Sequence, residues 1–166
     1  MALNYYTAST AGTVVAAAGT APFFIIQGSA TNSIRVKKIT IQGPTLTAVE
    51  YLNIIATRYS TAISGGTPTA LVSVPKASSY AASTQNLLNV YTAAPTAGTA
   101  VGTVASARVL GQATTAAAAG TVNDQIVFDF GTGIILKGAA EGLGVRFANA
   151  PATAVTLALT VEFDEE

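Results

Sequence analysis

The chain has 166 residues, of which 50% are hydrophobic and only 10% are charged, with eight basic residues balancing eight acidic ones. This length suits one domain with a sizeable core, and the zero net charge leaves no excess positive charge for binding nucleic acid. Cysteine and histidine are absent, which excludes disulfides and thiolate zinc sites and removes the commonest general base. The longest apolar run, residues 14–26, is interrupted by Gly19, Thr20 and Pro22 and is too short to cross a membrane.

Short β-branched or aromatic runs are separated by Gly, Pro, Ser, Thr or Ala about every ten residues, a rhythm typical of all-β proteins. The pattern predicts an N-terminal arm over residues 1–20, followed by one β-sandwich domain over residues 21–166. The expected strands cover residues 22–27, 33–42, 49–60, 70–74, 87–92, 103–110, 125–130, 134–137, 143–148 and 155–163.

The strand expected at residues 33–42, SIRVKKITIQ, changes its apolar parity between Val36 and Ile39. A shift of one residue turns every following side chain to the other face of a sheet. We therefore expect a β-bulge near Lys37 and Lys38. The last expected strand, VTLALTVEF, alternates without interruption, so one of its faces should lie in the core.

Two segments have some helical character. Residues 48–60, AVEYLNIIATRYS, place several apolar residues near one helical stripe, but their Ile, Thr and Tyr content favours a strand. Residues 111–120, GQATTAAAAG, are rich in alanine but too few to hold a helix alone, so we expect a loop.

The Gly65–Gly66 pair in ISGGTPTALVSVP is the feature most similar to a ligand-binding loop. A phosphate-binding P-loop places a lysine and a Ser or Thr after its glycines at the start of a helix. Here an expected strand follows, and the next lysine is Lys76. We therefore expect the two glycines to provide positive φ angles in a turn.

Asp124 and Asp129 are the carboxylate pair that best fits a glycosidase or a metal site. Their spacing of five places them on opposite faces of a regular strand, and no calcium-loop spacing surrounds them. A hydroxyl nucleophile would need an activating base, and no Ser-x-x-Lys occurs. We therefore expect no enzyme, no catalytic or metal-binding residue, no cofactor and no small-molecule substrate.

Four acidic residues lie within the last five positions. We expect them to form a solvated terminus, with a docking tail for a basic partner as the alternative. Near the other end, Tyr5 and Tyr6 are expected to hold the arm against a neighbouring surface.

Several motifs occur in a fixed order along the chain. A strand ending in a basic residue and Ser-Thr (58–61) precedes a Gly-Gly-Thr loop (65–67) and an apolar strand ending in Pro (71–75). A Tyr-Thr-x-x-Pro turn (91–95), a Leu-x-Gly-x-x-Glu step (136–141) and an alternating strand with an acidic end (155–166) follow. This order resembles small structural proteins of tailed bacteriophages, over about residues 20–166. Residues 76–86, KASSYAASTQN, depart from the polar or acidic residues that relatives often carry there, and the resemblance assigns this loop no contact.

The resemblance implies a virion protein on the capsid exterior, namely a capsid decoration (cement) protein with a jelly-roll fold that binds the major capsid protein and forms a homotrimer. The number of expected strands is sufficient for a jelly roll, and a weakly charged surface suits subunit contact. Expected interface contacts are residues 1–13 of the arm, with Tyr5 and Tyr6, together with Arg58 or Arg146 in interfacial pairing. Neither a nucleic acid nor a membrane is an expected partner.

Two alternatives stay open. One is a tail, neck or head-fibre subunit of the same kind of particle. The other is a carbohydrate-binding or adhesin-like β-sandwich, which would need exposed aromatic residues in a groove. The chain has no Trp and only six Phe and six Tyr, so the virion protein is the favoured interpretation.

Overall fold

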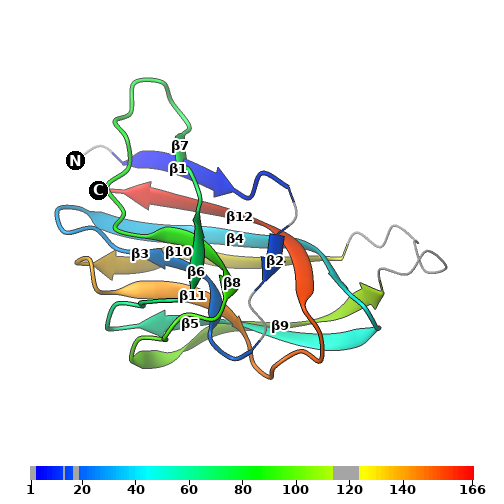
Figure 1. The fold of residues 1–166 in the computed structure, drawn as a ribbon. Helices are drawn as coiled ribbons and strands as arrows, with labels where there is room; N and C mark the ends of the chain where they lie inside the picture. Colours follow the sequence, from blue (N-terminus) through cyan, green and yellow to red (C-terminus); the bar gives the residue numbers. More distant parts are fainter. Residues whose placement is uncertain (1–2, 13, 17–18, 114–123) are drawn as a thin grey trace.

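The computed structural model describes residues 3–12, 14–16, 19–113 and 124–166. These residues form twelve β-strands and no helix, which confirms the all-β prediction (Figure 1). The strands are β1 (Asn4–Ser9), β2 (Val14–Ala16), β3 (Pro22–Gln27), β4 (Ser33–Leu46), β5 (Glu50–Tyr59), β6 (Thr67–Ala70), β7 (Val74–Pro75), β8 (Leu88–Ala93), β9 (Ala100–Ala113), β10 (Gln125–Lys137), β11 (Gly142–Phe147) and β12 (Val155–Glu165).

The strands form two antiparallel sheets that face each other as a β-sandwich. Sheet A has the order β7-β1-β12-β4-β10, with β2 also paired to β12, and sheet B has the order β6-β8-β3-β11-β5-β9. The sheets join at one corner, where Thr45 and Leu46 at the end of β4 pair in parallel with the end of β9. The β-sandwich prediction is confirmed, and the jelly-roll connectivity stays a prediction.

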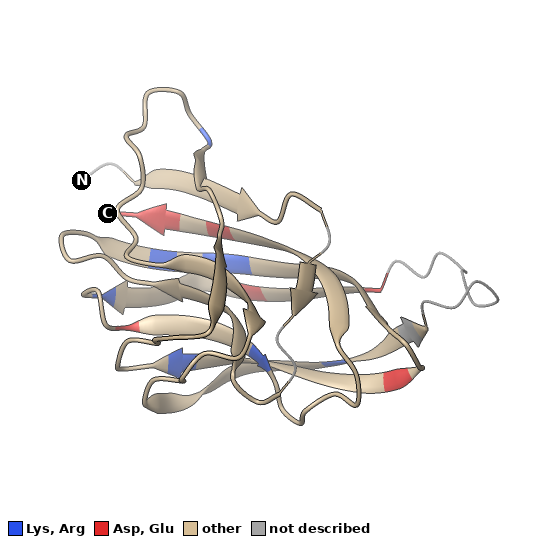
Figure 2. Cartoon of the chain, viewed as in Figure 1, with Lys and Arg blue, Asp and Glu red and all other residues tan. Residues whose placement is uncertain are grey.

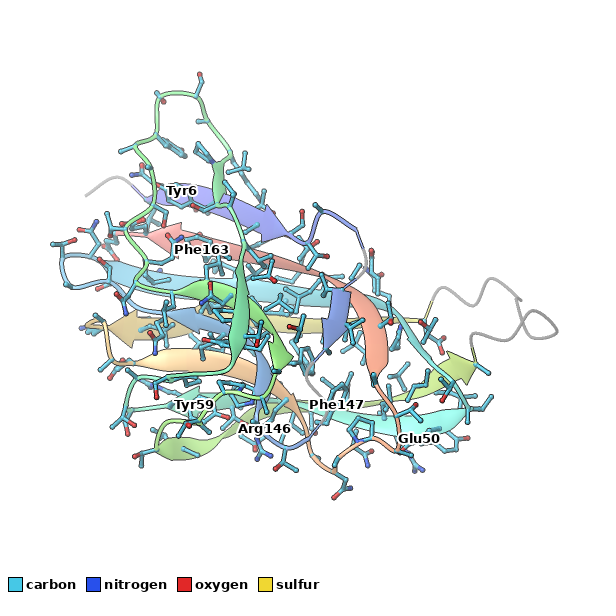
Figure 3. All side chains as sticks on the ribbon, in the orientation of Figure 1. Tyr6, Glu50, Tyr59, Arg146, Phe147 and Phe163 are labelled. Carbon is cyan, nitrogen blue, oxygen red and sulfur yellow. The ribbon has the colours of Figure 1, made fainter. Side chains whose placement is uncertain are left out.

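The core lies between the two sheets. In β12 the predicted alternation is confirmed, because every second residue from Val155 to Phe163 is at most 1% exposed. Aromatic pairs join neighbouring strands within the core. The ring centroids of Tyr6 and Phe163 (Figure 3) lie 5.3 Å apart. Those of Phe23 and Phe147 lie 4.7 Å apart.

The predicted bulge in β4 is confirmed. Glu162 of β12 pairs with Lys38, but the next residue, Phe163, pairs with Val36, so Lys37 is the extra residue. The bulge allows Val36 and Ile39 both to be fully buried although their positions differ in parity. On the other side of β4, the pairing with β10 shifts register between residues 129 and 134. The two strands predicted at 125–130 and 134–137 are therefore one irregular strand.

Two predictions about chain path are corrected. The arm expected over residues 1–20 contributes strands β1 and β2, which pair with β12 in sheet A. The strand expected at residues 70–74 is wrong, because the chain crosses there from β6 in sheet B to β7 in sheet A. Leu71, in this crossing segment, is only 9% exposed and belongs to the hydrophobic core.

The remaining segments follow the predictions where the structure describes them. Residues 48–60 are confirmed as a strand, since β5 covers most of them. Gly65 and Gly66 have φ angles of 69° and 73°, which confirms the predicted turn. A Cβ atom on Gly66 would lie 2.7 Å from the carbonyl oxygen of Ala93. In the loop expected at 111–120, residues 111–113 belong to β9 and the others lie outside the described residues.

Candidate functional site

Half of the charged residues gather on the outer face of sheet A, where β12 and β4 run side by side (Figure 2). Glu162 and Asp164 lie at the positions of β12 that alternate with the core residues Val161 and Phe163. Cross-strand pairs bring opposite charges together, as with Glu162 opposite Lys38 and Asp164 opposite Arg35. We call this surface the charged face, and it comprises Arg35, Lys37, Lys38, Lys76, Asp129, Glu162, Asp164 and Glu166.

Glu162 is the centre of the charged face. Its two carboxylate oxygens lie 2.6 Å from the Nζ atoms of Lys38 and Lys76. Hydrogen bonds from these two lysines lower the pKa of Glu162, and the carboxylate raises the pKa of Lys38. Arg35 pairs with Glu166 at 3.2 Å. These contacts neutralise the charges within the chain.

Asp164 is nearly inaccessible, at 1% exposure, and its closest cation is the Nζ atom of Lys37 at 3.7 Å. Neither of its carboxylate oxygens has a hydrogen-bond partner among the described residues. Burial therefore raises the pKa of Asp164, although Lys37 and Arg35 act to lower it.

Glu165 is also buried, at 3% exposure, but it is well bonded. It accepts hydrogen bonds from the Asn32 side chain at 2.7 Å and from the backbone N–H and hydroxyl of Thr84. Burial acts to raise its pKa, but these hydrogen bonds hold the pKa of Glu165 below its usual value. The solvated acidic terminus expected from the sequence is wrong, because β12 carries Glu162, Asp164 and Glu165 into these contacts.

The structure does not bring the four predicted interface residues together. Tyr5 is 41% exposed beside the charged face, whereas Tyr6 is 1% exposed and stacks on Phe163. Tyr6 therefore cannot offer its ring to a partner, which corrects that prediction. Arg58 on β5 pairs with Glu141 at 3.0 Å. Arg146 on β11 donates from Nε to the Thr57 hydroxyl at 3.2 Å.

Asp124 and Asp129 were the candidates for a catalytic or metal-binding pair, and both lie at backbone hydrogen bonds next to or within β10. Asp124 lies next to the start of β10, and its carbonyl oxygen accepts a hydrogen bond from the Gly43 N–H. Asp129 accepts a hydrogen bond from the Gly131 N–H at 2.8 Å, at the irregular part of β10. Within the described ranges, no cluster of three potential metal ligands is found.

A groove of about 500 Å³ lies beside β1, lined by residues 7–12, Val14, residues 69–72 and Val74. We call it the β1 groove. None of its lining residues is charged. Val72 and Val74, at 76% and 54% exposure, are among the most exposed large apolar residues of the described chain. Tyr5 and Val15, also exposed, lie on the neighbouring strands β1 and β2. Sequence reasoning missed this site because it expected residues 70–74 to be one strand.

The chain matches no protein-family model, no curated protein and no solved structure. Among the residues that the structure describes, no helix could span a membrane. The function is therefore argued from the charged face, the β1 groove and the sequence motifs.

Proposed function

We propose that the protein is a structural component of a tailed-phage virion, a capsid decoration (cement) protein that binds the major capsid protein on the outer shell as a homotrimer. One observation carries the protein-binding part of this proposal. Seven of the eight residues of the charged face take part in ion pairs within the chain, while exposed valines border an uncharged groove on the same sheet. An exposed apolar patch with a polar surround is typical of a protein contact site.

The positions of the sequence motifs support the phage part of the proposal. The Gly-Gly-Thr loop and the Tyr-Thr-x-x-Pro turn lie together, joined by a bridge between Ser64 and Thr96. Arg58 of the first motif pairs with Glu141 of the Leu-x-Gly-x-x-Glu step, 83 residues away. The motifs that carry the resemblance therefore meet in pairs within the fold.

The mechanism that we propose is mechanical. A protein that binds only the assembled shell stabilises that state by mass action. A trimer gains affinity through multivalency, because once one subunit has bound the shell, binding of the second and third subunits is effectively intramolecular. Many small apolar contacts then hold neighbouring shell subunits together.

The test is cryo-electron microscopy of phage particles that contain this chain, with light scattering of the recombinant protein in parallel. We expect β-sandwich density in trimers on the outer shell and a solution mass three times that of one chain. Density restricted to the tail or neck would contradict the decoration role and favour a tail or neck subunit. A monomer that never joins the particle would contradict the proposal as a whole.

A further inference from the structure

We propose that the β1 groove binds an extended, uncharged polypeptide strand of another protein, which adds to the outer edge of β1. The identity of the donor as the shell protein rests on the proposed function. The position of the site and the chemistry of its ligand depend on the residues of this chain alone.

The edge of β1 is only partly covered. All six residues of β1 pair with β12 in unbroken register. On the opposite edge, strand pairing among the described residues consists of Tyr6 with Pro75 and Thr7 with Val74. Beyond this point the chain before β7 turns toward sheet B (Figure 1). Residues of this crossing segment and of β1 together line the β1 groove. Backbone groups at such an edge can pair with an added strand.

β7 itself shows that this edge accepts a strand. Its two residues pair antiparallel with β1, and the Lys76 N–H donates to the carbonyl oxygen of Tyr5 at 2.8 Å. Residues of β1 alternate between the two edges, since the Thr10 N–H donates to Leu159 of β12 and the Tyr5 carbonyl oxygen accepts from Lys76 beside β7. A strand in the groove would therefore continue this ladder past Thr7 at the backbone N–H and C=O of Ser9.

The residues that line the groove determine which side chains of an added strand can enter it. Ala8 and Leu71 are buried, at 2% and 9% exposure, and Val72 stands exposed beside them. A charged side chain entering the groove would lose water and find no opposite charge among the lining residues. Small or aliphatic side chains fit this surface, and the volume of about 500 Å³ is in the usual range of sites that enclose a ligand.

Three other described edges carry features that discourage strand addition. β9 shifts register against β5 twice, which leaves Val101 and Val104 as extra residues. β10 is irregular after Asp129, and β6 has only four residues, including Pro68. Bulges, charges, prolines and short strands are the usual means by which edges are blocked. β1 therefore combines a regular edge with an adjoining groove.

The experiment is an NMR titration of the isotope-labelled full chain with the blocked peptide acetyl-Thr-Val-Ala-Val-Thr-amide. We expect the largest amide shifts at residues 8–12 and 69–72, and we expect Val72→Lys to weaken binding at least tenfold. Val101→Lys is the matched control, since Val101 is 62% exposed and lies outside the groove, and its affinity should equal that of the wild type. A peptide with glutamate in place of threonine should bind at least tenfold more weakly. Shifts elsewhere, no binding, or equal losses in the two variants would overturn the proposal.

A second measurement separates this inference from the proposed function. Wild-type protein, V72K and V101K are each added to phage shells that lack the chain, and shell-bound protein is quantified. Loss of binding in V72K alone supports the groove as the shell contact. If the peptide binds in the groove but no protein joins the shell, the proposed function fails and the groove stands. If all three proteins decorate equally and the peptide does not bind, the groove inference fails and the proposed function stands.

Discussion

The charged face and the β1 groove lie on the same sheet, but they differ in how many of their groups make contacts within the chain. On the charged face, Glu162 has both carboxylate oxygens within 2.6 Å of lysine Nζ atoms, so its hydrogen-bonding capacity is largely used within the chain. In the groove, valines remain exposed and part of the β1 edge carries no described partner strand. The comparison teaches that charge density alone does not locate a binding surface. A surface is available to a partner where its polar and apolar groups do not already make contacts within the chain.

Phe163 connects both regions. It belongs to β12, which carries part of the charged face, and its buried ring stacks on Tyr6 of β1. Phe163→Ala should cost about 3–5 kcal/mol of unfolding free energy, as is typical for a fully buried aromatic residue. Urea denaturation measures this loss. Tyr6→Phe is the matched control, because it keeps the ring and removes only the hydroxyl hydrogen bond to the Ala81 carbonyl oxygen, at a cost of about 1 kcal/mol. Equal losses in the two variants would contradict the assigned role of the ring stack.

Glu165 anchors the loop at residues 76–86 to β12 through its hydrogen bonds to Thr84. Glu165→Leu leaves the Asn32 side chain and the Thr84 N–H without their acceptor. We therefore expect it to lower the unfolding free energy at pH 7 by about 1–3 kcal/mol. The folded-state pKa of Glu165 is lowered. Its stabilisation is therefore present above the unfolded-state pKa and is lost as the pH falls through the folded-state pKa. Unfolding curves across the acid range should show a weaker pH dependence in the variant. An unchanged dependence would contradict this assignment.

Asp164, the neighbouring residue, should behave in the opposite way. Its folded-state pKa is raised by burial, so its ionisation opposes folding, and this cost grows as the pH rises from the unfolded-state pKa through the folded-state pKa. Asp164→Asn should therefore leave the unfolding free energy at pH 7 equal or higher, even though it removes the pairing with Lys37. Thermal unfolding of this variant beside the wild type measures the sign. A clear loss of stability would show that the pairing outweighs burial.

The smallest effect is expected at the exposed end of the charged face. Lys76 is 46% exposed where it pairs with Glu162, so Lys76→Ala should cost about 0.2–1 kcal/mol. Added salt at 1 M should shrink the difference between wild type and variant, because it screens exposed charges. Peptide binding in the β1 groove should not change with salt, since its lining has no charge. A strong salt dependence of that binding would remove the distinction between the two regions.

Features that depend on neighbouring residues could be predicted from the amino-acid sequence. The alternation of β12, the bulge at Lys37 and the positive φ angles of Gly65 and Gly66 all follow from short-range patterns. These features are local because side-chain parity and backbone freedom are properties of consecutive residues. The β-sandwich class follows from the same patterns repeated along the chain.

The pairing of distant segments could not be predicted in this way and is seen only in the folded chain. β1 joins β12 from the other end of the chain, and the Tyr6 hydroxyl bonds to Ala81, 75 residues away. The burial of Glu165 depends on Thr84, 81 residues away. The β1 groove exists because the chain crosses between sheets at Leu71, which no local pattern marks. The physical reason is that such contacts are selected by the joint burial of surfaces distant in sequence, and local propensity carries no information about them.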